Sequence, residues 1–417
     1  MADNKDKKVL NVPALRFPEF TDEWKRIKVS DLLDFYSTNS LSWEQLEYEP
    51  NEPYNLHYGL IHVGLPTLID LTKDKLPSIK NGNVPKKYEL CKEGDVAFAD
   101  ASEDTNEVAK VVEFYNLGGK KVVCGLHTIH GRNNNGQTAK GFLGYCFSST
   151  VFHNQIRRIA QGTKIYSINT RNFSEVFVGL PRRREQQKIA TLLRLIDERI
   201  ATQNKIIEKY ESLIQAIIYK AKMDGISKGT WRRIDLCKVL QERNEKNVDG
   251  RTICSVSVSQ GVVNQIEYLG RSFAAKQTSH YNVVKYGDIV YTKSPTGDFP
   301  YGIIKRSDIR EDVAVSPLYG VYIPASDSIG VILHFYFMRP SNAFNYLHPL
   351  IQKGAKNTIN ITNGRFLKNS VPLPISKSEA NTIAGILKTI QAKIEIEKNL
   401  LLSYTNEKEY LLRQMFI

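Results

Sequence analysis

Two stretches of the chain carry apolar residues at alternating steps of four and three positions. In the first stretch nine of the ten positions on this spacing are apolar: Ile189, Leu193, Ile196, Ile200, Gln203, Ile207, Tyr210, Ile214, Ile217 and Ala221. The spacing returns 194 residues later, where eight of ten positions are apolar: Ile383, Leu387, Ile390, Ile394, Glu397, Leu401, Tyr404, Lys408, Leu411 and Met415. This heptad pattern predicts two long helices, each burying one apolar stripe against another helix.

The sequence around the two predicted helices is also repeated. WKRIKVSDLL from Trp24 resembles WRRIDLCKVL from Trp231, and YELCKEGDVAF from Tyr88 resembles YNVVKYGDIVY from Tyr281. Further along, QGTKIYSIN resembles KGAKNTINI, and GLPRRREQQ corresponds to PLPISKSEA. Matches in the same order indicate an internal duplication. Each half is expected to have a start marked by tryptophan, a domain of short strands, a basic loop, Leu-Pro and a long helix.

The expected fold class is α+β, with two similar domains separated by two long antiparallel coiled-coil helices. Short β-branched and aromatic runs, such as GDIVYT, LYGVYIP and ILHFYF, predict strands. Pro181 and Pro374 precede the helices, and Gly225 and Gly229 predict a helix stop and a linker. The expected segments are a first domain over 1–181 with a mobile tail over 1–10, a helix over 182–223, a linker and second domain over 224–374, and a C-terminal helix over 375–417.

The two predicted helices are expected to pair with each other. A seam of about 33 residues spans roughly 50 Å, and a single helix would expose that stripe to water. Gln203 and Glu397 are the midpoints of the two seams, so an antiparallel pair places both in one layer where they can hydrogen-bond. A parallel pair without stagger aligns them as well. The connection through a complete second domain favours the antiparallel pair, with the domains at opposite ends about a pseudo-two-fold axis. A stabilising hairpin or an oligomerisation element is the alternative to a spacer between two domains.

Composition points to an anionic partner. The 417 residues carry a net charge of +13, with a sequence pI near 9.3, and such an excess is most often associated with nucleic acid. No run approaches the roughly 18 apolar residues of a membrane span, and the N-terminal segment lacks the apolar core of a signal peptide. Five cysteines without CxxC spacing favour buried thiols in a reducing cytoplasm over disulfides or a zinc site.

Motifs of enzymatic chemistry are missing from the sequence. There is no GxxxxGK[ST] phosphate loop, no GxGxxG after a strand, no histidine pair with ligand spacing, and no Asn/Asp-Pro-Pro-Tyr/Phe motif of amino-methyltransferases. Asp95 and Asp288 each follow glycine and precede an apolar run, which predicts a turn. A chain without catalytic activity is therefore expected. An autonomous DNA-acting nuclease is the open alternative, because isolated acidic residues are present.

Basic and amide-rich loops lie at matching places in the two halves. Arginine can bridge guanine, asparagine can bridge adenine, and lysine mostly neutralises phosphate. The candidate DNA-binding residues of the first half are His127, Arg132, Lys164, Tyr166, Asn169 and Arg171. Those of the second half are Lys293, Thr296, Tyr319, Lys356, Asn357, Asn360, Asn363 and Arg365. The loops differ between the halves while the framework matches, which indicates two domains that recognise different half-sequences.

This layout resembles the specificity subunit of type I restriction-modification systems. VPALRFPEFTDEW near the start is similar to the opening of the family's Gram-positive members. GLPRRREQQKIATLLRLID contains the signature LP-x-x-x-EQ-x-x-I that leads into the family's first long helix. The second copy, LPISKSEANTIAGIL, lacks the Glu-Gln pair, which puts in doubt any role of that pair there. The resemblance covers essentially the whole chain.

The resemblance implies a non-catalytic reader of DNA. Two target-recognition domains in inverted orientation would each recognise one half of a split, asymmetric target, and the helices would set the unread gap. The chain itself would need no cofactor and no metal. Methyltransferase subunits, usually two, would modify adenine with S-adenosylmethionine, and motor-nuclease subunits would use ATP and Mg²⁺. A coiled-coil scaffold with two protein-binding domains is the alternative.

Overall fold

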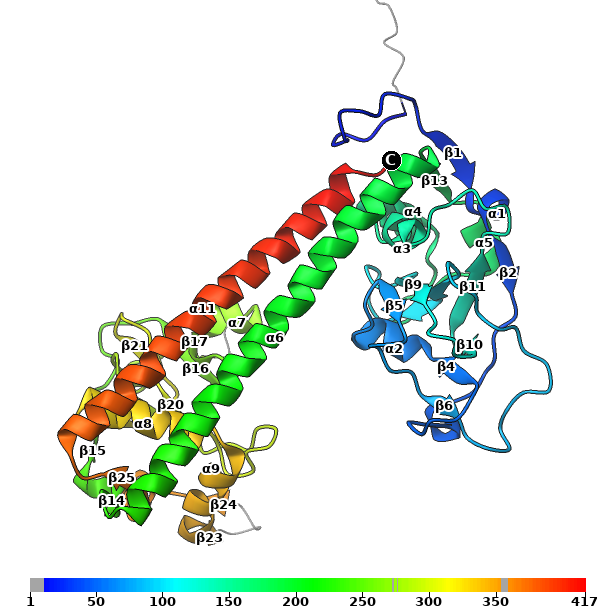
Figure 1. Ribbon diagram of the computed structural model, residues 1–417. Helices are drawn as coiled ribbons and strands as arrows, with labels where there is room; N and C mark the ends of the chain where they lie inside the picture. Colours follow the sequence, from blue (N-terminus) through cyan, green and yellow to red (C-terminus); the bar gives the residue numbers. More distant parts are fainter. Residues whose placement is uncertain (1–10, 272–273, 276, 354–358) are drawn as a thin grey trace, which may run out of the picture. The chain divides into compact units, whose positions relative to one another are not determined.

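The structure is a computed structural model that describes residues 11–271, 274–275, 277–353 and 359–417. The chain divides into two compact units (Figure 1). Unit 1 comprises Met1–Gln203 with Leu400–Ile417, and unit 2 comprises Asn204–Asn399. Both are mixed α+β, as the sequence predicts. Among the described residues, no helix combines the length and the apolar content needed to cross a membrane.

Unit 1 is built on a five-stranded sheet and a four-stranded sheet. The five-stranded sheet has the order β2-β11-β7-β9-β5, and the four-stranded sheet has the order β10-β4-β6-β3. The strands are β1 (Lys25–Lys28), β2 (Asp34–Tyr36), β3 (Leu46–Glu47), β4 (Tyr54–Leu56), β5 (Leu68–Asp70), β6 (Ser78–Ile79), β7 (Val96–Ala99), β8 (Ala101–Ser102), β9 (Val111–Asn116), β10 (Val122–Cys124), β11 (Thr128–Arg132), β12 (Tyr166–Ser167) and β13 (Phe177–Leu180). The short helices are α1 (Val29–Leu32), α2 (Tyr58–Val63), α3 (Phe142–Phe147), α4 (Thr150–Ile159) and α5 (Thr170–Ser174).

Unit 2 repeats part of this plan. Its main sheet has the order β15-β22-β19-β20, which corresponds to β2-β11-β7-β9, and a second sheet has the order β17-β16-β21-β18. The strands are β14 (Trp231–Asp235), β15 (Leu240–Glu242), β16 (Ile253–Ser257), β17 (Gly261–Asn264), β18 (Asn282–Val284), β19 (Ile289–Tyr291), β20 (Ile304–Arg306), β21 (Val313–Val315), β22 (Gly320–Pro324), β23 (Gln352–Lys353), β24 (Ile359–Asn360) and β25 (Ser370–Pro374). The short helices are α7 (Gln265–Leu269), α8 (Asp327–Phe337), α9 (Pro340–Leu347) and α10 (Asn363–Phe366).

Two long helices, α6 (Arg183–Ser227) and α11 (Lys377–Gln414), each contribute a part to both units. In unit 1 they run antiparallel, because Leu411 and Met415 near the end of α11 share a core with Ile189 and Leu193 near the start of α6. Figure 1 shows the red end of α11 beside the first turns of α6. Further along, the Lys408 ammonium lies 2.6 Å from the Asp197 carboxylate.

Most predicted seam positions lie on the buried side of the helices. Those that are buried are Ile189, Leu193, Ile196, Gln203, Ile207, Ile214, Ile383, Leu387, Ile390, Ile394, Leu411 and Met415. Those that are half-buried are Ile200, Tyr210, Ile217, Ala221, Glu397, Leu401, Tyr404 and Lys408. Near the end of α6 the buried residue is Ile218 rather than Ile217, because a helix of 3.6 residues per turn drifts from a 3.5-residue repeat. The shared polar layer of Gln203 and Glu397 stays a prediction.

The same contact anchors each unit to a long helix. The Trp24 indole N–H donates to Glu185 on α6 at 3.3 Å, and the Trp231 indole N–H donates to Glu379 on α11 at 2.8 Å. Both tryptophans are buried, and the strands that they begin or precede pair antiparallel with β13 and β25. A glutamate with this contact is therefore present in both halves, separated from Leu-Pro by three residues in the first and by four residues in the second. Only the glutamine, Gln186, lacks a counterpart, since Ala380 follows Glu379.

Two predictions about local structure are wrong. The run ILHFYF was expected to be a strand, but it ends helix α8, which Ser326 caps by accepting from the Ile329 N–H. Most residues of this helix are apolar and buried. A continuous apolar run of this kind cannot be told from a buried strand by its hydrophobic pattern alone. Gly225 was expected to stop α6, but it lies inside the helix, where Trp231 leaves no room for a side chain. Gly229, with φ +70°, follows the helix end instead.

Candidate nucleic-acid interface

The loops that the sequence indicates in unit 1 lie together at the end of the sheet where β7 stops and β11 begins. The His127 Nδ1 lies 3.1 Å from the Asp100 carboxylate. The Ile168 N–H donates to the Asp100 carbonyl at 2.9 Å, and Tyr166 pairs with Ser102 in the two-stranded sheet β12-β8. Three loops that are far apart in the sequence therefore form one surface. We call it the loop surface, made up of His127, Lys164, Tyr166, Asn169 and Arg171.

The side chains of the loop surface differ in their exposure and in the hydrogen bonds that they already make. Lys164 and Arg171 are exposed, and the His127 side chain is 49% exposed. Tyr166 is half-buried against the core of unit 1. Asn169 is exposed, but its Oδ1 accepts from the Asn172 N–H at 2.8 Å and caps helix α5. The two cations are thus the groups most accessible to a phosphate.

Aromatic side chains extend the loop surface, and sequence reasoning did not find them. The Tyr58 ring lies 5.2 Å from His127 and 5.9 Å from His62, between ring centroids. Trp43, which is 46% exposed, lies 4.4 Å from the ring of His57, the residue before Tyr58. These residues come from separate loops and helix ends, so no spacing in the sequence connects them. An exposed tryptophan beside a histidine offers apolar and polar contacts to a nucleic acid.

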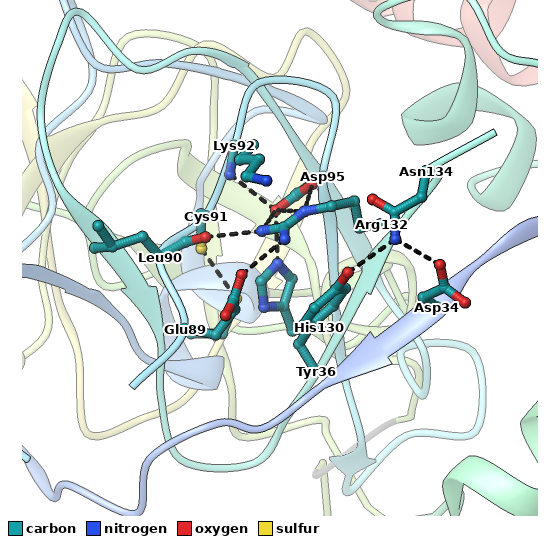
Figure 2. A network of polar contacts seen from close by, with 11 residues as sticks. Asp34, Tyr36, Glu89, Leu90, Cys91, Lys92, Asp95, His130, Arg132 and Asn134 are labelled. Carbon is teal, nitrogen blue, oxygen red and sulfur yellow. Dashed lines mark hydrogen bonds and ion pairs between the residues drawn. The ribbon is translucent and has the colours of Figure 1, made fainter. Parts of the chain in front are cut away.

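Arg132 does not belong to the loop surface, although the sequence suggested it. Its guanidinium donates to Asp95 at 2.8 Å and to Glu89 at 2.7 Å, and it lies 4.3 Å above the Tyr36 ring (Figure 2). Arg132 is only 5% exposed. Its donor groups are already paired with Asp95 and Glu89 inside the unit, so we do not include Arg132 among the residues proposed to contact DNA.

Both Gly-Asp turns are built the same way. Asp95 accepts from the Lys92 backbone N–H at 2.8 Å, and Asp288 accepts from the Lys285 backbone N–H at 2.8 Å. Asp95 also accepts from Arg132, and Asp288 accepts from Arg243 at 2.6 Å. Strands β7 and β19 begin directly after these residues. Both aspartates are buried and hold a turn, as the sequence predicts.

In unit 2 the candidate residues lie around β19, β22 and α10. Lys293 is half-buried with φ +62°, and burial lowers the pKa of its ammonium group. Tyr319 directly precedes Gly320, which pairs with Tyr291 two residues before Lys293, so Tyr319 and Lys293 lie at the same end of the sheet. Thr296 is exposed in the next turn.

The remaining candidates of unit 2 follow the same strands. Asn363 begins α10 and donates to Glu242 at 2.6 Å, and the Arg365 Nε donates to the Leu350 carbonyl at 3.1 Å. Phe366 of α10 stacks on Tyr291 and Tyr322. Lys356 and Asn357 lie outside the described residues, and of Asn360 only the backbone in β24 is described.

The described residues contain one group able to hold a metal ion, formed by Cys91, Cys124 and His130. All three residues are buried. On the long helices, a groove of about 480 Å³ in unit 1 is lined by Leu192, Leu195, Ile196, Glu198, Arg199, Thr202, Tyr404 and Glu407.

No protein-family model and no curated protein matches the sequence. Among solved structures, the S subunit of the type I restriction-modification system from M. genitalium is similar over 97% of this chain and 99% of that chain, with 15% identity and a TM-score of 0.60. A chain from a structural study of assembly and conformational transition in the type I R-M system covers 93% of this chain and 96% of its own length, with 14% identity and a TM-score of 0.48. The HsdS subunit from Thermoanaerobacter tengcongensis covers 93% and 95%, with 16% identity and a TM-score of 0.35. The first likeness confirms the resemblance at the level of the fold: the chain has the fold of a type I restriction-modification S subunit.

Proposed function

We propose that the chain is the DNA sequence-recognition subunit of a type I restriction-modification complex. The observation that carries the proposal is the fold likeness to an S subunit over nearly the whole length of both chains. Two units of related topology, each with its own loops, support recognition of a target in two halves. The net charge of +13 supports an anionic partner. The chain would act on chromosomal or invading DNA in the cytoplasm.

The proposed contacts with DNA lie on the loop surface of unit 1 and around β19, β22 and α10 of unit 2. Exposed Lys164 and Arg171 would pair with phosphates or base edges, and Asn169 would use its amide nitrogen. Tyr58 and Trp43 would contact sugars or bases. In unit 2, exposed Thr296 and half-buried Arg365 would act on the second half-site.

Helices α6 and α11 would serve as the spacer between the two recognised half-sites. The same helices would carry methyltransferase subunits, usually two, together with motor-nuclease subunits. Methyl transfer and cleavage would then belong to those partners, with S-adenosylmethionine, ATP and Mg²⁺ bound to them. This chain would be a reader without catalytic activity. A scaffold that binds proteins alone is the second candidate, and the accessible groove on α6 and α11 is compatible with it.

Methylation mapping separates the two candidates. The chain is co-expressed with the methyltransferase subunit encoded beside it in a host free of adenine methylation, and N6-methyladenine is mapped across the genome. We expect a split, asymmetric motif that disappears when this chain is omitted. Lys164→Ala with Arg171→Ala should weaken modification, whereas Lys25→Ala, which removes an exposed cation of β1, should not. A stable complex that leaves no motif contradicts the reader and favours the scaffold.

Helix length tests the spacer. One heptad inserted at matching places in both α6 and α11 keeps the apolar seam in phase and lengthens the pair by about 10 Å. At 3.4 Å per base pair, the unread gap should grow by about three base pairs. The control carries the heptad in α6 alone, which offsets the seams and should abolish modification. An unchanged gap in the doubly extended protein contradicts the spacer.

A further inference from the structure

Three side chains with soft donor atoms meet inside unit 1. Cys91 lies in the segment that leads into β7, Cys124 ends β10, and His130 lies in β11. One donor atom from each lies within 4.8 Å of the others, and the two sulfur atoms are 3.6 Å apart. All three residues are buried, with exposures of 5%, 1% and 0%. Figure 2 shows His130 joined to Asp95 by a dashed line, with the Cys91 sulfur in the same network.

The hydrogen bonds of His130 leave a nitrogen lone pair inside this cluster. Its Nε2 lies 2.8 Å from the Asp95 carboxylate, which the Arg132 guanidinium holds in an ion pair. A carboxylate accepts and cannot donate, so Nε2 carries the hydrogen and Nδ1 of the neutral ring carries a lone pair. Nδ1 is buried and has no hydrogen-bond partner in the described part of the chain. A buried polar atom left in this state costs about 1–3 kcal/mol.

The arrangement matches a metal-ligating histidine. Such a histidine usually donates its other ring N–H to a carboxylate, which fixes the tautomer and the ring orientation. Asp95 would have that role here, supported by Arg132. The sulfur separation also fits: two sulfur ligands at 2.3 Å from a tetrahedral ion lie about 3.8 Å apart. A disulfide would need about 2.05 Å, far less than the observed 3.6 Å.

We propose that Cys91, Cys124 and His130 bind one thiophilic cation, Zn²⁺ or Cu⁺. Two thiolates and an imidazole are soft ligands that disfavour Mg²⁺ and Ca²⁺. The two thiolates neutralise a divalent ion, and His130 completes a set of three protein ligands. The bound ion would tie β10, β11 and the segment entering β7 together, directly behind the loop that carries His127. This site is independent of the proposed function.

The sequence argued against a metal site, because the ligands do not follow a recognisable spacing. Cys91 and Cys124 are separated by 33 residues along the chain, and His130 follows six residues later (130 − 124 = 6). The three come together through the isolated bridge between Leu90 and Val123 and through the pairing of β11 with β7. The contacts that assemble the site are thus contacts of the folded sheets.

Metal analysis of the purified full chain tests the proposal. The protein is purified under reducing conditions, loaded with Zn²⁺, passed through a desalting column and measured by inductively coupled plasma mass spectrometry for zinc and copper. We expect about one ion per chain, with at least a tenfold lower content in Cys91→Ser and Cys124→Ser. Cys146→Ser, which alters an equally buried thiol outside the cluster, should keep its metal. Loading with Cu⁺ in a parallel experiment identifies the preferred ion.

A second measurement does not depend on variants that fold. Co²⁺ added to the wild-type apoprotein should give the intense ligand-field absorption of a four-coordinate ion and a thiolate-to-cobalt charge-transfer band, both removed by competing Zn²⁺. A chain that holds less than about a tenth of an ion and leaves the Co²⁺ spectrum unchanged overturns the proposal. A mass two hydrogens lower before reduction, with Cys91 and Cys124 joined in one cross-linked peptide, overturns it in favour of a disulfide.

Discussion

Glu113 should make the stability of unit 1 depend on pH. Its carboxyl group is buried on β9, where one oxygen accepts from the Gly141 backbone N–H and the other accepts from the Gly144 N–H at 2.7 Å. Burial raises the pKa of Glu113 from 4.5 to about 7, because lost hydration disfavours the carboxylate more than the N–H donors favour it. In the unfolded chain the pKa returns to its ordinary value.

The direction of the pH effect follows from these two values. Between pH 4.5 and about 7, the folded chain binds more protons at Glu113 than the unfolded chain does. The free energy of unfolding therefore falls as the pH rises through this window. This loss of stability is absent below pH 4.5 and complete above about pH 7. At 1.36 kcal/mol per unit of pKa shift, the total loss is roughly 3 kcal/mol.

Glu113→Gln supplies the matched control. Glutamine is neutral at every pH, and its amide nitrogen cannot accept, so one of the two backbone N–H groups loses its partner at a cost of about 1–3 kcal/mol. Native-state hydrogen exchange of the β9 amides measures the local free energy of opening in both proteins, at about pH 5 and about pH 8. Comparing the two proteins at each pH cancels the contributions of all other titrating groups.

The wild type should be the more stable protein at about pH 5. At about pH 8 its advantage should shrink by roughly 3 kcal/mol, so that the variant equals or exceeds it. A difference between the two proteins that stays the same at both pH values would refute the reasoning. It would mean that the Gly141 and Gly144 N–H groups keep Glu113 ionised throughout, and that they outweigh its burial.

Three further predictions concern the anchor of unit 2 and the loop surface. Gly225→Ala should lower the free energy of unfolding by about 1–3 kcal/mol in urea titrations, because the new Cβ would lie 1.9 Å from Cδ1 of the rigid Trp231 ring. Glu379→Ala should cost about 1–3 kcal/mol, since the Trp231 N–H loses its acceptor, whereas Glu379→Gln keeps an oxygen there and should cost less. Lys164→Ala should reduce the slope of log affinity against log salt by about 1 in DNA titrations, and Lys25→Ala should leave the slope unchanged.

The long helices were predictable because their signal is local. The heptad spacing lies within one continuous segment, and the structure has helices at Arg183–Ser227 and Lys377–Gln414 where helices were expected over 182–223 and 375–417. The duplication also has a local signal, since the Gly-Asp turns and the tryptophan starts repeat in the sequence. Periodicity could not separate the buried helix α8 from a strand, because burial on most sides erases the polar face that marks a helix.

The candidate site was only partly predictable, because its residues come together from distant parts of the chain. Lys164, Tyr166 and His127 follow from composition. In the structure His127 contacts Asp100, Tyr166 pairs with Ser102, and Lys164 lies two residues before Tyr166. The sequence does not indicate that Trp43 belongs to this site, because its neighbour His57 comes from another loop. Whether a basic residue faces solvent or the interior depends on partners far away in the chain. The pattern of a single sequence does not identify those partners.

Arg132 shows that some basic residues stabilise the fold and are not available to a ligand. The Gly-Asp turn needs a cation to satisfy its buried carboxylate, and each unit supplies an arginine, Arg132 for Asp95 and Arg243 for Asp288. Removing either arginine would leave a buried charge without its partner, which costs about 3–5 kcal/mol. Such arginines are fixed by the fold and cannot vary with a target. Under the proposed function, side chains that vary with the target would therefore lie outside these ion pairs, as Lys164 and Arg171 do.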